Sequence, residues 1–362
     1  MKLNELFVLS ELYAMKEQGY VRASQHPTLP LWVYCYTDKT VIEEHWNDVT
    51  RRCRGLVVGP DDEIVAHCMP KFHNASEHIN GKPYAPALPN EPFKVYEKAD
   101  GSLGTIFFYE GRWLAATKGG FQSEQAQWAQ RWLDQVNMDN LSTANTYTVE
   151  IIYPQNRIVV DNGPTETLRL LTVFRPDGCE RPIDWYGAAW ELTVGGSVIR
   201  QYPDAKLSTL LFRSQRNQRP DGTPVLGHEA EGYVLHYASG LRVKVKFADY
   251  IRLHGVVTGL TERHVWEILR DGRDLADLLA LLPDEYCEWL LSTADRLRND
   301  FHDRAQRMVH DLLQTGIPAD PRHFPAFTQS GSGATRRIYD VVSAQAWDSL
   351  KPAAVGPWKG DM

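Results

Sequence analysis

The chain has 362 residues and carries 39 Lys and Arg against 46 Asp and Glu, which gives a formal net charge of −7. Its apolar share of 43% and charged share of 23% are ordinary for a globular protein, and they exclude a disordered, collagen-like or rod-shaped chain. The acidic total argues against a bulk polyanion binder of the histone type, although a local basic groove is enough for an enzyme that acts on nucleic acid.

The N-terminal residues predict a helix rather than a targeting segment. Residues 1–19 carry charges every few positions and contain no uninterrupted apolar run, which is typical of an amphipathic helix and not of a signal peptide. No later stretch approaches the length of a membrane span. Because the cysteines are scattered without a CxxC pair, we expect neither a disulfide framework nor a zinc site, and we expect a soluble, cytoplasmic protein. They are Cys35, Cys53, Cys68, Cys179 and Cys287.

Alternating apolar and polar residues predict strands through the first two-thirds of the chain. Two hairpins are expected, with turns at Glu110-Gly111 and at Ser239-Gly240. Further strands are expected over 31–36, 55–58, 63–69, 146–152, 157–160 and 168–174.

Helical periodicity predicts one helix within this β-rich part and several after it. Residues 122–136 form the first, because Trp128, Trp132 and Val136 fall on one apolar face. The Pro- and Gly-containing segment 212–224 predicts a loop. From about residue 255 the composition becomes helical, and helices are expected over 261–282, 284–315 and part of 336–350, with a break at Pro283 and a looser tail at Gly331-Ser332-Gly333.

The strongest local signal is the string KADGS at 98–102, between two expected strands. A lysine attacks as a nucleophile only in its neutral form, and a glycine beside it allows close approach of a nucleotide to the backbone. Taken alone, the string favours an ordinary exposed turn. Lys244 and Lys246 project to the same face of a strand, where two like charges are unfavourable unless an anion or solvent lies between them. Charges that interrupt apolar strands in this way suit a pocket in which cations hold phosphates and acids hold a metal or a ribose.

Together these strings resemble the motifs of the covalent nucleotidyltransferases, which comprise DNA ligases, RNA ligases and capping enzymes. KADGS (98–102), EGYV (231–234) and KVK (244–246) match motifs I, IV and V. The closer resemblance is to the phage-type RNA ligase 1 family, and it runs from about residue 30 to 254 with the motifs in order. The supporting strings are CRGLV (53–57), MPKFHN (69–74), KGGFQSEQA (118–126), PQNRIV (154–159) and DYIRLH (249–254).

The resemblance implies roles for individual residues. Lys98 would attack the α-phosphate of ATP and form a lysyl–AMP adduct, and we expect the neighbouring cations to keep Lys98 deprotonated beforehand. Glu231 would lie near the catalytic Mg²⁺, for which Mn²⁺ can substitute. The other implied nucleotide-site residues are Arg54 and Lys71 at the outgoing phosphates, Lys244 and Lys246 at the α-phosphate, Glu150 by the sugar, and Tyr36, Phe72, Gly101, Lys118 and Tyr250 in the pocket.

The resemblance also implies the fold and the partners, while the division into two domains follows from the change of composition near residue 255. We expect an α+β protein: an ATP-grasp-like nucleotidyltransferase domain of antiparallel sheets with flanking helices over 1–254, then a smaller all-helical domain over 255–362. The substrates would be RNA with 5′-phosphate and 3′-hydroxyl ends, such as cleaved tRNA, with a separate end-healing kinase–phosphatase as a partner. The expected state is a monomer without membrane association, in the host cytoplasm if the protein is phage-encoded.

Three alternatives stay open at this point. A DNA ligase or a GTP-using capping enzyme normally carries an OB-type barrel after motif V, whereas the remainder here predicts helices. A non-catalytic nucleic-acid-binding protein is disfavoured by the complete set of Lys98, Glu231, Lys244 and Lys246. Residues 255–362 hold 12 basic and 16 acidic residues, 12 − 16 = −4, so RNA binding by that part does not follow from its charge.

Two further groups of residues are interpreted as structural or solvated rather than functional, and the role of a third stays open. His73 and His78 are expected to be surface or loop histidines, because they have no Cys partner for zinc. Asp271, Asp274 and Asp277 predict a solvated helix face. The arginines of the 212–224 loop, Arg213, Arg216 and Arg219, fit RNA-backbone contact and simple solvation about equally.

Overall fold

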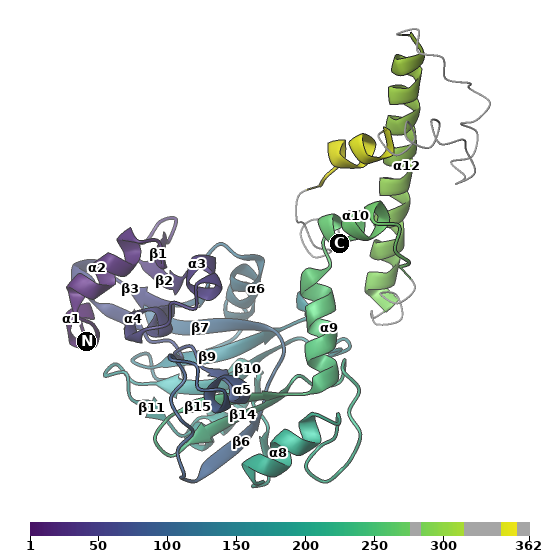
Figure 1. Ribbon diagram of the computed structural model, residues 1–362. Coiled ribbons are helices and arrows are strands. Elements are labelled where there is room, and N and C mark those ends of the chain that lie inside the picture. Colours follow the sequence, from purple (N-terminus) through teal and green to yellow (C-terminus); the bar gives the residue numbers. More distant parts are fainter. Residues whose placement is uncertain (276–283, 315–341, 353–362) are drawn as a thin grey trace. The chain divides into compact units, whose positions relative to one another are not determined.

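Three β-sheets build the first of the two units into which the chain divides, Met1–Ile251 and Arg252–Met362. They are seen in a computed structural model that describes residues 1–275, 284–314 and 342–352 (Figure 1). The division lies close to the expected boundary at 254/255, but independent folding of the two parts stays a prediction. No described helix combines the length and apolar character that crossing a bilayer requires.

The N-terminal sheet is antiparallel, with strand order β1-β2-β3-β4. Its core includes Leu3, Phe7, Leu12 and Leu56, so the first helices close one face of the sheet. The strands are β1 (Val21–Gln25), β2 (Trp32–Tyr36), β3 (Arg54–Val58) and β4 (Ile64–Ala66), and the helices are α1 (Leu3–Leu6), α2 (Leu9–Glu17), α3 (Asp38–Ile42) and α4 (Asp48–Arg52), with a 3₁₀ turn at Pro60–Asp62.

The central sheet has the order β11-β10-β9-β7-β8, and β12 pairs in parallel with β10. Helix α6 begins where the Ser123 hydroxyl accepts from the Ala126 amide, and its predicted apolar face packs on the core around Tyr147 and Ile151. The strands are β7 (Ser102–Tyr109), β8 (Arg112–Thr117), β9 (Thr146–Ile152), β10 (Thr167–Phe174), β11 (Glu180–Arg181) and β12 (Ser197–Val198). The helices are α6 (Glu124–Leu133) and α7 (Gly187–Val194), with 3₁₀ turns at Pro154–Asn156 and Ile183–Trp185.

The third sheet has the order β13-β6-β14-β15-β5 and carries the expected second hairpin. Its strands are β5 (His73–Asn74), β6 (Phe93–Glu97), β13 (Gln201–Tyr202), β14 (Gly232–Tyr237) and β15 (Arg242–Lys246), with helices α5 (Ala75–Ile79) and α8 (Leu207–Ser214) beside it. The segment 98–101 connects β6 of this sheet to β7 of the central sheet. Arg54, Lys98, Glu231 and Lys246 lie at or next to the ends of strands, whereas Glu150 and Lys244 lie within β9 and β15.

The second unit is helical in its described residues, as expected. It contains α10 (Glu262–Arg270), α12 (Asp284–Gln314) and a helical segment at 342–349, while α9 (Ala248–Gly259) spans the division between the units. Trp266 is buried and donates its indole N–H to the Trp347 carbonyl at 2.8 Å, which ties the 342–349 segment to α10.

One predicted strand is wrong. Residues 157–160 form no strand, because the backbone N–H groups of Val159 and Val160 both donate to Asp100 Oδ2, at 2.9 and 2.8 Å. A side-chain carboxylate thus takes the place that a neighbouring strand would otherwise have. The strand expected over 63–69 is also shorter than predicted and comprises only Ile64–Ala66.

The helix predictions differ at their ends. The expected N-terminal helix is two helices, because Phe7 is extended and turns its side chain into the core. Helix α10 ends at Arg270, before a turn in which Gly272 has φ +66°, so the prediction of a helix is wrong at residues 271–275. The rest of the predicted helix, 276–282, lies outside the described residues. The expected 212–224 loop starts inside α8. The predicted features at Pro283 and 331–333 lie outside the described residues.

Gly232 permits the close approach of β14 and β15, and this generates a stability prediction. Its φ is +150°, and a Cβ there would lie 2.1 Å from the Val245 carbonyl oxygen. We expect Gly232→Ala to lower the free energy of unfolding by about 3 kcal/mol, because steric overlap adds to backbone strain. Gly240→Ala is the matched control: its φ is +86° with nothing within 4 Å, and it should lose only about 1 kcal/mol. Urea denaturation of both variants measures the difference, and equal losses would contradict the steric argument.

Candidate active site

The carboxylate of Glu231 lies between two lysine ammonium groups. Its Oε2 accepts from Lys98 Nζ at 2.8 Å, and its Oε1 is 2.6 Å from Lys246 Nζ. The Glu231 side chain is only 4% exposed, so all three charges are largely removed from water. The backbone fixes this arrangement, because Lys98 N–H donates to the Gly232 carbonyl and Gly232 pairs with Lys246.

The acids around Lys98 decide its protonation. Burial alone would lower the pKa of Lys98, but Glu231, Glu150 and Asp100 outweigh burial and hold that pKa above its ordinary value. Burial would likewise raise the pKa of Glu231, whereas Lys98 and Lys246 lower it overall. The expectation that neighbouring cations keep Lys98 deprotonated is therefore wrong, because carboxylates dominate its surroundings and raise its pKa.

Glu150 and Gly101 lie together beside this group. Burial raises the pKa of Glu150 to about 7, although Lys98 partly opposes the rise. A Cβ on Gly101 would lie 2.6 Å from the Ile151 carbonyl oxygen and 3.1 Å from Glu150 Cγ, so a glycine is required where the 98–101 segment crosses β9. Glu150 can thus exchange a proton near neutral pH.

A group of basic residues lies near Lys98, away from the Glu231 carboxylate. Burial, followed by repulsion from Lys71 and Lys98, lowers the pKa of Lys244 to about 6. Burial and Arg54 lower the pKa of Lys71 to about 8. Within the described chain, no carboxylate lies within ion-pair distance of the members of this group, and the buried Arg54 Nε has no hydrogen-bond partner. The group comprises Arg54, Lys71, Lys118 and Lys244. Basic groups without neighbouring acids, which regain protons when an anion arrives, are suited to binding a polyanion.

Aromatic rings lie against these cations. The Phe72 ring is 5.4 Å from Arg54 Cζ and 5.7 Å from Lys244 Nζ, and Lys118 Nζ is 5.4 Å from the Tyr36 ring centroid. Lys71 Nζ lies 5.2 Å from the ring of Trp46, which meets Tyr36 edge to face. Sequence reasoning missed Trp46, since it lies outside the recognised strings.

Asp100 and Tyr250 form a buried hydrogen bond beside Lys98. Tyr250 is 1% exposed and donates its hydroxyl to Asp100 Oδ1 at 2.8 Å, so it braces the 98–102 segment rather than lying open to a ligand. Burial, with Glu231 adding to it, raises the pKa of Asp100, while its hydrogen bonds oppose the rise. Lys246 Nζ lies 5.0 Å from the Tyr250 ring. No role is predicted for Asp100 from the sequence, although it lies two residues after the nucleophile candidate Lys98.

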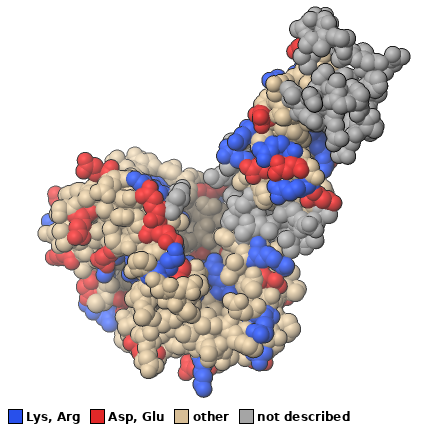
Figure 2. All heavy atoms as spheres, viewed as in Figure 1, with Lys and Arg blue, Asp and Glu red and all other residues tan. Residues whose placement is uncertain are grey.

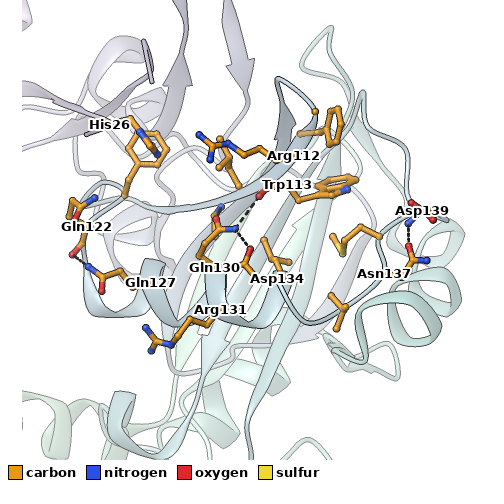
Figure 3. A pocket seen from close by; sticks show the side chains of 18 residues that line it. His26, Arg112, Trp113, Gln122, Gln127, Gln130, Arg131, Asp134, Asn137 and Asp139 are labelled. Carbon is orange, nitrogen blue, oxygen red and sulfur yellow. Dashed lines mark hydrogen bonds between the residues drawn. The ribbon is translucent and has the colours of Figure 1, made fainter. Parts of the chain in front are cut away.

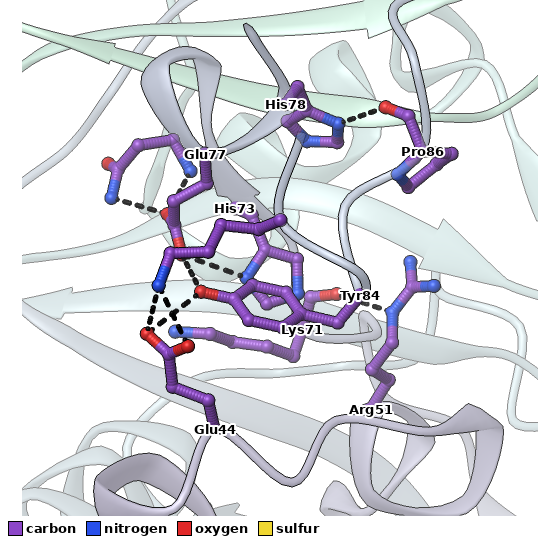
Figure 4. A network of polar contacts seen from close by, with 10 residues as sticks. Glu44, Arg51, Lys71, His73, Glu77, His78, Tyr84 and Pro86 are labelled. Atoms are coloured by element: carbon purple, nitrogen blue, oxygen red, sulfur yellow. Dashed lines mark hydrogen bonds and ion pairs between the residues drawn. The ribbon is translucent and has the colours of Figure 1, made fainter. Parts of the chain in front are cut away.

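A polar network holds the segment that carries Lys71 (Figure 4). Lys71 N–H donates to the Arg51 carbonyl at 2.7 Å, and Glu77 accepts from the Tyr84 hydroxyl and lies 3.5 Å from His73 Nδ1. His73 and His78 are 2% and 4% exposed, so the prediction of surface histidines is wrong. Both are buried because β5 and α5 pack into the third sheet.

A separate cavity of about 730 Å³ lies along β8 and α6 (Figure 3) and is lined by none of the predicted site residues. Gln130 closes the free edge of β8 there, because its side-chain amide accepts from Ala115 N–H and donates to the Trp113 carbonyl. The described residues contain no group of three His, Cys, Asp or Glu side chains arranged to hold a metal. Asp271 pairs with Arg270 and Arg273, and Asp277 lies outside the described residues.

Removing Asp100 should release the 157–160 segment. Asp100→Ala removes the carboxylate that accepts from two buried N–H groups and from the Tyr250 hydroxyl, and we expect the free energy of unfolding to fall by about 3 kcal/mol, against about 1.5 kcal/mol for Tyr250→Phe. Hydrogen–deuterium exchange should speed up over 157–160 in Asp100→Ala only. Protection retained there in Asp100→Ala would refute the bracing role.

The Glu231 carboxylate should set the titration of Lys98. We expect Glu231→Gln to lower the pKa of Lys98, because burial and the neighbouring cations then prevail. Competitive acetylation across pH, read by mass spectrometry of the Lys98 peptide, measures this pKa directly. Glu97→Gln is the matched control, since Glu97 precedes Lys98 and pairs with Arg169 instead. An unchanged Lys98 titration in Glu231→Gln would contradict the assignment.

Comparison with known proteins places this geometry in context. A family model described as RNA ligase, of the T4 RNA ligase 1 type, matches residues 52–250. A protein of Autographa californica nuclear polyhedrosis virus, named as a bifunctional polynucleotide kinase/RNA ligase, is 30% identical over 142 residues, covering 32% of this chain and 20% of the viral protein.

Solved structures resemble the chain more weakly. An archaeal ATP-dependent RNA ligase superposes with a TM-score of 0.48 at 15% identity, over 95% of this chain and 96% of that one. A Naegleria gruberi RNA ligase mutant solved with ATP and Mn has a TM-score of 0.33 at 15% identity, over 45% and 51% of the two chains. With scores below 0.5, the family model and not these superpositions is the basis for assigning a family.

Proposed function

The chain belongs to the phage-type RNA ligase 1 family, whose model covers residues 52–250, and on that premise we propose that it is an ATP-dependent RNA ligase. It would join RNA 5′-phosphate and 3′-hydroxyl ends through a lysyl–AMP and an adenylated-RNA intermediate. The observation that carries this proposal is the site itself: the partly buried Lys98 is held by the buried Glu231, near basic residues that have no carboxylate within ion-pair distance.

The first step is attack of Lys98 Nζ on the α-phosphorus of ATP. A P–N bond forms, the bond from the α-phosphorus to the bridging oxygen breaks, and pyrophosphate leaves. Lys98 must first lose a proton, for which Glu231 Oε2 at 2.8 Å and Glu150, with a pKa of about 7, are the nearby acceptors. A neutral lysine is required because an ammonium has no free electron pair.

The cation group fits a triphosphate. Arg54, Lys71 and Lys244 would neutralise charge on the phosphate oxygens, which is the main requirement of phosphoryl and nucleotidyl transfer. The lowered pKa values of Lys71 and Lys244 would rise again when an anion arrives, so binding would be linked to proton uptake. Tyr36, Phe72 and Lys118 would line the same pocket.

Glu231 is the carboxylate that would hold Mg²⁺, and both of its oxygens contact ammonium groups. Mg²⁺ or Mn²⁺ bound there would supply positive charge that weakens the attraction of Glu231 for the Lys98 proton. Glu231 would then hold the ion while Lys246 keeps the carboxylate in place.

The later steps follow from the same chemistry. An RNA 5′-phosphate oxygen would attack the adenylate phosphorus and release Lys98, and a 3′-hydroxyl would then displace AMP and seal the strand. The substrate is proposed to include cleaved tRNA. A kinase–phosphatase partner is also proposed, in line with the kinase and ligase named together for the viral relative. A monomer, a cytoplasmic location and domains at 1–254 and 255–362 complete the proposal.

Lys98→Ala and Lys98→Arg should both abolish the covalent adduct, because alanine has no amine and a guanidinium stays protonated. The measurement is retention of label on the protein after incubation with α-labelled ATP or GTP and Mg²⁺ and denaturing electrophoresis. Lys94→Ala, an exposed lysine on the same β6, is the matched control and should label like the parent.

The same variants separate the steps. Sealing of a chemically adenylated RNA donor should partly survive in Lys98→Ala, because that donor bypasses the first step. An alanine variant that still carries AMP on a lysine would refute the nucleophile assignment. Label from GTP alone would favour the capping-enzyme alternative, and sealing of DNA ends alone would favour a DNA ligase.

A further inference from the structure

A locally basic segment adjoins the site in this acidic chain. Residues 200–219 contain five basic residues and one acidic residue, 5 − 1 = +4, although the whole chain carries −7. Figure 2 shows Lys and Arg side chains over α8, which lies in this segment. The term α8 surface is used below for six residues in and around this helix: Arg200, Lys206, Phe212, Arg213, Arg216 and Arg219.

The α8 surface is tied to the candidate nucleophile at one end. Glu97 N–H donates to the Arg200 carbonyl at 2.8 Å, immediately before Lys98, and β13 continues this pairing with β6. Its other end is tied to the residues after Lys246, because Asn217 Oδ1 accepts from the Asp249 amide at 2.8 Å. A nucleic-acid strand bound to this surface would therefore lie next to the candidate nucleotide site.

An arginine stacked on an exposed aromatic ring marks the centre of the α8 surface. Phe212 is 52% exposed, and Arg216 Cζ lies 3.7 Å from the centroid of its ring. Helix α8 buries Leu210 and Ser214 instead, so the Phe212 side chain contributes little to the core. Paired Arg and aromatic planes are a typical platform for stacking nucleobases.

The guanidinium groups keep their charge available. Arg213 donates to Gln218 Oε1, Arg216 to the Phe212 carbonyl and Arg219 to the Pro224 carbonyl. All three acceptors are neutral, and across the described residues no carboxylate forms an ion pair with these arginines. Three arginines oriented by neutral groups can still bind phosphates.

We propose that the α8 surface binds single-stranded RNA, with Arg213, Arg216 and Arg219 on the phosphates and a base stacked on the Phe212–Arg216 pair. The chemistry favours a single strand because an aromatic platform needs an unpaired base. The choice of RNA rests on the proposed function. Solvated arginines, the bland alternative, would not account for an exposed phenylalanine under one of them.

The test measures RNA binding without catalysis. The probe is a fluorescent single-stranded RNA 20-mer with 5′-hydroxyl ends, followed by anisotropy at several NaCl concentrations. We expect Arg213→Ala/Arg216→Ala to weaken binding roughly tenfold or more and to reduce the slope of log K against log salt by about 1.4, at 0.7 per lost phosphate contact. Phe212→Ala should weaken binding by roughly tenfold with the slope unchanged.

Matched controls make the result specific. Arg112→Ala/Arg131→Ala removes two exposed arginines beside the separate cavity and should bind RNA like the parent. Arg216→Lys keeps the charge but loses the stacking plane, so it should retain the salt slope and lose affinity. Circular dichroism confirms that each variant folds.

The outcomes separate this proposal from the proposed function. All α8 variants should still form lysyl–AMP. Parent-like RNA binding in Arg213→Ala/Arg216→Ala would overturn the α8 surface, as would an equal loss in the Arg112/Arg131 control or equal competition by polyglutamate. A parent protein that binds RNA here but never labels with ATP would overturn the proposed function alone.

Discussion

The ion pairs of Glu231 are the interaction on which the site depends. A carboxylate this deeply buried is tolerated only when it is paired, and here both of its oxygens meet an ammonium group. Those contacts in turn require β6, β14 and β15 to be adjacent and in register, since they carry or border the three residues. Gly232 allows that register because no side chain separates β14 from β15 at this point. The charge triad and the strand pairing therefore stabilise each other.

The candidate site contains an acidic part and a basic part, and the pKa values of its lysines are shifted in opposite directions. On the acidic side, Glu231 and its neighbours raise the pKa of Lys98, whereas on the cationic side burial and repulsion lower the pKa of Lys244 to about 6. Lysine side chains thus play two parts: Lys98 keeps its proton in a hydrogen bond to Glu231, whereas Lys244 can take up a proton when an anion binds. This division explains how a polyanion could bind beside an acid without direct repulsion, because the cations lie where the charge is needed.

Polar backbone groups show how local patterns yield to tertiary structure. The RIVV string has strong β propensity, yet Val159 and Val160 give their amides to Asp100. A buried carboxylate needs donors, and two consecutive amides satisfy it better than a strand partner would. Likewise, the lack of a Cys partner predicts surface or loop positions for His73 and His78, but β5 and α5 carry them into the interior. Neither result can be derived from neighbouring residues. Asp100 lies 59 and 60 residues before Val159 and Val160, and the burial of the two histidines depends on the pairing of β5 with β15 in the third sheet.

The sequence by itself determined most strands and the helical character of the second unit, because side-chain periodicity is a local property. The resemblance of its short motifs to a known family assigned Lys98, Glu231 and Lys246 to one site, and the structure brings these three side chains into direct contact. Only the tertiary structure decided the protonation of Lys98, the bracing role of Asp100 and Tyr250, and the presence of Trp46 beside Lys71. Each of these depends on distances between groups from different sheets, and electrostatic and hydrogen-bond energies follow those distances rather than positions along the chain.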